Sequence, residues 1–246
     1  MKNVVFPLLL VLFACPIQAQ TKVFKEISDD ISTQFKAITQ DNNLVGYLAF
    51  TRLEKADADS FNYRVTIMDE NLKDIGKVEF RQENLELQTV SFEQNLLCLG
   101  YIQSSLSGVQ KIRTVRGYRK FTDAATSSHM LIQFINLSGK IINTYYQEVN
   151  LEAGVVSNRN PYAVLKLIGY LKYGMQIRNI PNSGFCLFYG DNFKQDLVLF
   201  DTRGVLTHKQ EIPTLADHYF LRASATDIYL LTKKDVRVPE GGNKLY

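Results

Sequence analysis

The sequence predicts an all-β protein, because a two-strand pattern occurs in it three times. Each copy has an alternating run of apolar and polar residues, a short turn and a second alternating run. Such alternation is typical of strands with one buried face. The copies span residues 63–80, 129–149 and 196–212. Many Tyr and Phe residues and an apolar share of 46% also fit a β-rich globular chain that is long enough to bury a core.

The turns of the three copies share a chemical signature. Asp69, Asn136 and Asp201 each follow an apolar residue at the end of the first run. A short Asx side chain can accept a hydrogen bond from the backbone two residues on, and Gly139 or Gly204 can take the positive φ that closes the turn. Each copy is therefore predicted to be a β-hairpin, and spaced hairpins indicate a repeat protein.

A second unit alternates with the hairpins. Residues 36–50 align without a gap on residues 88–102, and residues 178–189 and 222–231 are looser versions. Each is a polar turn followed by an apolar strand. A long-period repeat of four-stranded antiparallel units favours a β-propeller. In that interpretation the hairpins are the middle strands of each blade. The innermost strands, covered on both faces, are the apolar runs 44–50, 96–101, 185–189 and 228–231.

The predicted strands lie near residues 44–52, 62–69, 73–80, 87–92, 95–103, 129–136, 140–148, 175–180, 184–190, 195–201, 205–212, 218–223 and 227–233. They give a β-propeller-like array of about three blades plus one strand, whereas closed propellers have four or more blades. The chain is then either a fragment of a longer protein or an open array that self-associates through a blade edge. We favour the fragment, because a bare edge strand after Asp235 would promote aggregation.

Residues 1–19 are predicted to be a secretory signal peptide. Lys2 precedes an apolar run over residues 4–14 and a polar exit. Lipidation at Cys15 is the less favoured alternative, because Phe13 and Pro16 fit that signal poorly. We therefore expect export to the periplasm or beyond. No later run is long and apolar enough for a transmembrane segment, and a net formal charge of +3 gives no reason to expect nucleic acid as a partner.

The remaining chain divides into an entry segment, residues 20–41, and a partial β-propeller, residues 42–246. Apolar residues three and four apart suit an amphipathic helix over residues 21–40, although an extended entry strand fits equally well. Insertions at 104–128 and 150–174 interrupt the repeat. In the second insertion, Pro161 at the first helical position and Gly174 beyond the end predict a helix over residues 161–172.

Cys98 and Cys186 occupy the same place in their repeats, LLCLGY and GFCLFY. Equivalent residues of neighbouring blades should lie about 10 Å apart, the spacing of stacked sheets. That exceeds the roughly 7 Å limit between the Cα atoms of a disulfide. Both are therefore predicted to be free, buried and small apolar side chains.

The candidate site is a cationic segment in the first insertion. Its cations could hold an anionic glycan, a lipid headgroup or an acidic partner surface. One solvated strand of an exposed hairpin would give the same alternation. The segment consists of Lys111, Arg113, Arg116, Arg119 and Lys120, with Tyr118 interleaved.

No metal or cofactor site is expected. His129, His208 and His218 lie at no metal-ligand spacing from another ligand. Asp57 and Asp59 resemble part of a calcium loop, but the Gly and the terminal carboxylate of such a loop are missing. A polar turn accounts for them better.

Catalytic signatures are also absent from the sequence. It contains no G-x-S-x-G, no H-E-x-x-H and no phosphate-binding glycine loop. Asp69 and Asp201 could be taken for the carboxylate pair of a glycosidase. Their turn role already explains them, and Asn136 in the remaining copy cannot act as an acid.

The repeats and the exit sequence IQAQ resemble those of secreted β-propeller proteins, including uncharacterised exported proteins of Bacteroidota. The resemblance implies fold and export but no active-site residue. We therefore expect a non-catalytic binding or scaffold module for a protein or glycan partner. The alternative is a propeller hydrolase or lyase acting on glycans or peptides, with its active site partly outside this chain. Asp, Glu, His or Tyr clustered at one mouth of the ring would favour the enzyme. A truncated remnant without function is a third possibility.

Overall fold

Sixteen β-strands make up the part of the chain that the computed structural model describes. The described residues are 32–41, 43–58, 60–104, 128–156, 166–191, 193–213 and 218–234. Every strand pairing among them is antiparallel. Within these ranges, no helix has the length and apolar character needed to cross a membrane.

Three sheets have four strands each, in sequence order from edge to edge. The first sheet consists of β1 (Ser32–Gln40), β2 (Asn43–Lys55), β3 (Ser60–Asp69) and β4 (Asp74–Glu83). The second sheet consists of β5 (Leu85–Glu93), β6 (Leu96–Gln103), β7 (Ser128–Asn136) and β8 (Ile141–Val149). The third sheet consists of β11 (Met175–Ile180), β12 (Gly184–Gly190), β13 (Gln195–Phe200) and β14 (Leu206–Glu211).

Two further strand pairs complete the described structure. β9 (Glu152–Val156) and β10 (Lys166–Tyr170) form a small sheet between the second and third sheets in sequence. β15 (His218–Ala223) and β16 (Ile228–Lys233) form the last hairpin. The fourth unit of the array therefore has two strands in the described residues.

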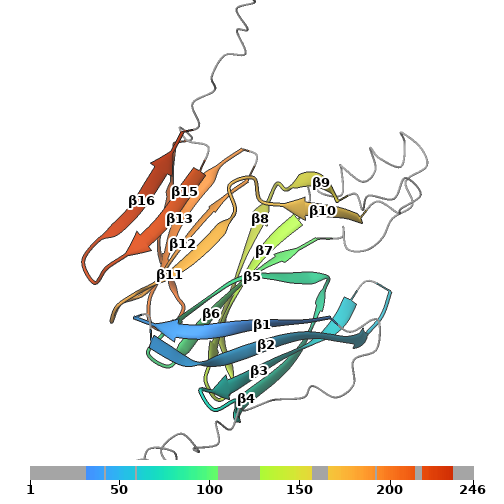
Figure 1. Cartoon of the computed structure of the whole chain (residues 1–246). Coiled ribbons are helices and arrows are strands. Elements are labelled where there is room, and N and C mark those ends of the chain that lie inside the picture. Colours follow the sequence, from blue (N-terminus) through green and yellow to red (C-terminus); the bar gives the residue numbers. More distant parts are fainter. Residues whose placement is uncertain are drawn as a thin grey trace, which may run out of the picture.

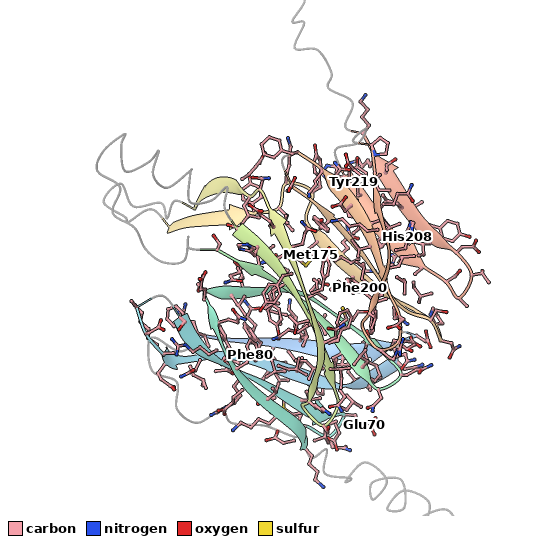
Figure 2. The ribbon with its side chains drawn as sticks, turned by 180° about the vertical axis from the view of Figure 1, so that it is seen from behind. Glu70, Phe80, Met175, Phe200, His208 and Tyr219 are labelled. Atoms are coloured by element: carbon pink, nitrogen blue, oxygen red, sulfur yellow. The ribbon has the colours of Figure 1, made fainter. Side chains whose placement is uncertain are left out.

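The four units stack in sequence order, and apolar layers fill the space between them (Figure 1). Phe80 packs in the layer between the first and second sheets, Phe200 between the second and third, and Tyr219 between the third sheet and the last hairpin (Figure 2). The first strands of the units lie next to one another: β1 contacts β5, β5 contacts β11, and β11 contacts β15.

The outer face of the last hairpin differs from these layers. Tyr219 and Leu221 are buried against the third sheet. Phe220, Tyr229 and Leu231 are 53%, 53% and 56% exposed. Alternate residues of a strand point to opposite faces, so these three side chains mark the face turned away from the third sheet.

The structure confirms every predicted strand to within a few residues, but it corrects the order within each sheet. The apolar runs 44–50, 96–101, 185–189 and 228–231 lie in the second strand of each unit, not in the innermost one. Each sheet begins one strand earlier, with β1, β5, β11 or β15. The Asx hairpins accordingly join the third and fourth strands. In the second and third sheets these runs are apolar because β6 and β12 lie inside a sheet that is covered on both faces, as the complete burial of β12 shows. The run 228–231 in β16 stays largely exposed in the described residues.

The structure decides between the two interpretations of the entry segment in favour of the strand, and the predicted helix over residues 161–172 is wrong over its described residues. Residues 32–40 form β1, the entry strand that was the alternative, and Phe35 pairs with Ala49 of β2. Within the range 161–172, Lys166–Tyr170 form β10. The backbone groups of both segments pair with a neighbouring strand, which overrides local helical spacing.

The three predicted Asx turns are confirmed. The predicted bond from the backbone N–H two residues on is present at Asp69 and Asp201, at 2.9 and 2.8 Å, whereas Asn136 accepts from the hydroxyl of Ser138 instead, at 2.8 Å. In each, the Oδ1 atom of Asp69, Asn136 or Asp201 accepts a hydrogen bond from the backbone N–H four residues on, at 2.9, 2.9 and 2.8 Å respectively. The backbone N–H of the same residue donates to the carbonyl at that position. One side chain thus satisfies donors that a tight turn would otherwise leave without a partner.

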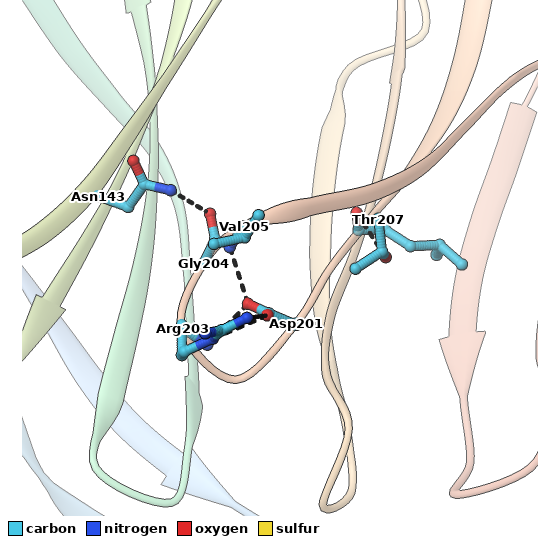
Figure 3. Close-up of polar contacts among 7 residues, drawn as sticks. Asn143, Asp201, Arg203, Gly204, Val205 and Thr207 are labelled. Atoms are coloured by element: carbon cyan, nitrogen blue, oxygen red, sulfur yellow. Dashed lines mark hydrogen bonds and ion pairs between the residues drawn. The ribbon is translucent and has the colours of Figure 1, made fainter.

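The turn glycines also allow one sheet to contact the sheet before it. Gly204 has a φ of +72°, and its carbonyl accepts a hydrogen bond of 2.8 Å from Nδ2 of Asn143 on β8 (Figure 3). A Cβ atom on Gly204 would lie 2.3 Å from Cγ of Phe134. Gly139 contacts the backbone of Lys77 in the same way. In the first hairpin Leu72 takes the positive φ, and the described residues include no sheet before that turn.

Cys98 and Cys186 are buried and free, as predicted. Cys98 lies in the layer between the second and third sheets, and Cys186 lies between the third sheet and the last hairpin. Burial raises the pKa of Cys186 from 9.0 to about 12 and raises that of Cys98 well above its ordinary value. The thiolate is the reactive form, so both thiols should be inert in the folded chain.

We predict that Gly204→Ala lowers the free energy of unfolding by about 2–4 kcal/mol, from backbone strain plus overlap with Phe134. Gly174→Ala is the matched control, because Gly174 has a φ of +75° and no atom within 4 Å of its would-be Cβ. It should cost about 1 kcal/mol. Urea denaturation of both variants measures the difference, and equal losses would show that the contact between sheets contributes nothing.

We predict that neither Cys98 nor Cys186 reacts with a maleimide reagent at pH 8 until the chain unfolds. The folded-state pKa values exceed the unfolded ones, so the protonated thiols stabilise the fold fully below about pH 9. For Cys186 that contribution is lost as the pH rises from about 9 to about 12. Cys186→Ser should therefore flatten part of the loss of stability in this window. Rapid native labelling would contradict the burial.

Candidate functional site

The cationic segment predicted as a site lies outside the described residues. Lys111, Arg113, Arg116, Tyr118, Arg119 and Lys120 all fall between β6 and β7, within residues 105–127. The signal segment 1–19 and Asp59 also lie outside them. Both insertions leave from one end of the second sheet, because Gln103 pairs with His129 and Ser128 pairs with Val149.

A pocket lies where the first strands of all four units meet, and we call it the first-strand pocket. Its volume is about 360 Å³. It lies toward the end that carries the turns between first and second strands, and for the second sheet that is the end opposite the insertions. It is lined by Ala37, Ile38, Thr39, Asp41, Val90, Ser91, Phe92, Ile177, Arg178, Asn179, Arg222 and Ala223.

Strand alternation explains why the pocket combines apolar and polar residues. Ile38, Phe92 and Ile177 are buried in the layers between the sheets. Their sequence neighbours lie on the opposite faces of the same strands. The pocket therefore has a rigid apolar framework behind polar residues such as Ser91 and Arg178.

Three charged residues line the pocket. Arg178 is half-buried, and its Nη1 atom donates to the carbonyl of Ile177 at 3.0 Å. Arg222 is exposed, and so is Asp41, which has a φ of +52° in the turn between β1 and β2. In the part of the chain that the structure describes, neither arginine forms an ion pair. The charged residues of the lining thus sum to one net positive charge.

Glu93 fixes one wall of this pocket. Its carboxylate is 3% exposed and accepts hydrogen bonds of 2.9 Å from the side-chain amide of Asn179 and the backbone N–H of Asn182. It therefore ties the end of β5 to the turn between β11 and β12 and orients Asn179. From the sequence Glu93 counted only as a polar turn residue, because its partners are nearly 90 positions away.

Gln176 fixes the opposite wall. Its Nε2 atom donates to the carbonyl of Tyr219 at 2.6 Å, and its Oε1 atom accepts from the backbone N–H of Leu221 at 2.9 Å. One side chain thus pairs with a donor and an acceptor of β15. This holds the last hairpin, and with it Arg222 and Ala223, beside β11.

The histidines and acidic residues elsewhere in the described chain do not come together as metal ligands. No three ligand side chains could share a metal ion there. His129, His208 and His218 are exposed on different sheets. Asp57 accepts hydrogen bonds of 2.8 Å from the backbone N–H and the hydroxyl of Ser60, so the apparent calcium-loop fragment is a polar turn at this residue.

A partly buried cluster links the second and third sheets. Asp196 accepts a hydrogen bond from the hydroxyl of Tyr189 and lies 3.3 Å from Nζ of Lys209. Nζ of Lys209 in turn donates to Gln147 at 2.6 Å. Burial, and then the hydrogen bond to Asp196, raise the pKa of Tyr189. Tyr189 is fully buried and Asp196 is 2% exposed, whereas the side chain of Lys209 is 33% exposed. The cluster therefore joins the two sheets, with its tyrosine and carboxylate buried and its lysine reaching solvent.

We predict that Glu93→Ala lowers the free energy of unfolding by about 2–4 kcal/mol, because it leaves two donors without their charged acceptor. Glu86→Ala, at an exposed position of the same strand, should change it by about 0.5 kcal/mol or less. Urea denaturation of both variants gives the comparison. Equal effects would mean that the Glu93 contacts do not hold the wall.

Residues 1–143 match the model of a family of unknown function, DUF6770. The matched range includes the whole first sheet, β5 to β7 and the start of β8. No curated protein and no solved structure matches the chain. Because the family model covers more than half of the 246 residues, the chain belongs to the DUF6770 family of unknown function.

Proposed function

We propose that this chain is an exported, non-catalytic binding or scaffold module whose sheets are blades of an incomplete β-propeller. Support for the blades comes from the stacking of four antiparallel units with adjacent first strands. The same Asx hairpin closes three of them. The exposed apolar face of the last hairpin is consistent with an incomplete array, because in a complete one another blade would pack against this face.

The composition of the first-strand pocket carries the non-catalytic part of the proposal. Hydrolases and lyases that act on glycans or peptides need paired acid and base groups or an activated nucleophile. Of the described residues that line the pocket, Asp41 is the one carboxylate, and none is His, Tyr or Cys. Hydroxyl, amide and guanidinium groups make up the other polar side chains. Such a lining suits recognition by hydrogen bonding better than proton transfer.

The proposal also includes export of the chain and a second contact surface at the cationic segment. The predicted signal over residues 1–19 would direct the chain to the periplasm or beyond. Lys111, Arg113, Arg116, Arg119 and Lys120, with Tyr118, would supply a second contact surface, for an anionic glycan or an acidic protein face. Insertions into repeat proteins commonly carry the binding residues.

We predict that the purified chain retains members of a panel of defined acidic glycans and peptides and releases them unchanged. Replacing the five cations by Ser should weaken retention of the acidic members roughly tenfold or more without lowering the melting temperature. Five exposed lysines elsewhere provide the matched control. They are Lys36, Lys55, Lys73, Lys140 and Lys234.

Biolayer interferometry measures retention, and mass spectrometry of the released ligands detects any conversion. Shortened or eliminated products would favour the hydrolase or lyase instead. Retention that drops equally in both Ser variants would show that only overall charge matters and would remove the cationic segment from the proposal.

A further inference from the structure

We propose that the first-strand pocket binds a small carboxylic acid that carries hydrogen-bond donors away from its carboxylate, such as a sugar acid. This goes beyond the function proposed above, because it assigns a ligand class to a pocket toward the opposite end of the second sheet from the insertions. It does not depend on the cationic segment.

The two sides of the pocket differ in chemistry. The strands β11 and β15 contribute Arg178 and Arg222, whose guanidinium groups supply N–H donors. Asn179 also lies on this side, and its amide already donates to Glu93. The strand β5 and the segment from β1 to its turn contribute Ser91, Thr39 and Asp41, which supply hydroxyl and carboxylate oxygens. A ligand that spans the pocket thus meets guanidinium donors on one side. On the other side it meets the carboxylate acceptor of Asp41 and two hydroxyls that can donate or accept.

The donor side is suited to a planar oxyanion. A guanidinium group presents its N–H donors as a fork that matches a carboxylate. Arg178 uses one N–H group on its own chain and forms no ion pair with any described carboxylate. It is also half-buried, so water screens its charge less than on an open surface.

The net charge of the lining and the volume of the pocket restrict the class of ligand further. The lining has one net positive charge, which one carboxylate neutralises. A phosphate monoester would bring nearly two negative charges close to Asp41, which disfavours it. The volume of about 360 Å³ lies near the lower end of the range for small-molecule sites. A ligand of one or two sugar rings fits these limits.

The walls are set before any ligand arrives. Glu93 orients Asn179 through a hydrogen bond of 2.9 Å, and Gln176 holds β15 beside β11 through two hydrogen bonds. A pre-formed site has a lower ordering cost on binding, so modest contacts can give measurable affinity.

Isothermal titration calorimetry with D-glucuronate, D-glucose and L-serine tests the proposal. Glucuronate should bind with a Kd near or below about 1 mM, and glucose, which lacks the carboxylate, should not bind detectably. Serine has a carboxylate and donors but no ring. Its binding in place of glucuronate would assign the same chemistry to an amino acid.

Substitutions of residues that line the first-strand pocket test whether glucuronate binds there. Arg178→Gln and Arg222→Gln should each weaken glucuronate binding roughly tenfold, which is about 1.4 kcal/mol. Asp41→Asn tests the acceptor side and should weaken binding less, because the amide oxygen still accepts. Arg203→Gln is the matched control, because Arg203 lies in the turn after β13, away from the pocket, and should leave Kd unchanged.

Thermal melts check folding, and Arg222 is exposed, so its variant should fold even if the Arg178 variant does not. The proposal is overturned if neither acid binds, if glucose binds as tightly as glucuronate, or if both pocket arginine variants match the Arg203 control. Retention of the glycan and peptide panel would then still support the binding module. If glucuronate binds as expected but the panel is not retained, the proposed binding module is refuted and the ligand assigned to the first-strand pocket is still supported.

Discussion

Burial of both faces of the second and third sheets is the constraint on which the rest of this structure depends. It explains the nearly continuous apolar runs of β6 and β12, whose residues face a neighbouring sheet on either side. It also explains the close approach of the hairpin turns, since the turn of one sheet contacts the sheet before it through Gly139 or Gly204. Packing between sheets and turn chemistry are therefore parts of one arrangement.

Polar groups within this stack are used to join units. Glu93 links the second sheet to the third, Gln176 links the third sheet to the last hairpin, and Asp196 with Lys209 and Gln147 joins the second and third sheets. Each would cost free energy if it were buried without a partner. Apolar contacts are not directional, so they alone would not set the relative positions of the sheets. The hydrogen bonds and the ion pair are directional and fix the position of each unit against its neighbour.

The first-strand pocket is a consequence of the same stacking. Each first strand lies at one edge of its sheet, so four such edges meet at one place. Three of them bring an apolar residue into a layer between sheets and leave a polar neighbour at the pocket. Recognition chemistry is thus collected from positions spread over most of the chain. The hairpin turns, which the sequence marks most clearly, serve the architecture instead.

The sequence by itself determined the all-β class, thirteen of the strands, the three Asx turns and the free state of Cys98 and Cys186. These features follow from alternation, from short-range hydrogen bonding and from repeat position, all of which act locally. Only the tertiary structure decided that residues 32–40 and 166–170 are strands, because their pairing partners override local helical spacing. It alone placed Arg178, Arg222 and Asp41 around one pocket and gave Glu93 its role. Contacts between residues far apart in the chain leave no spacing that a single sequence can show.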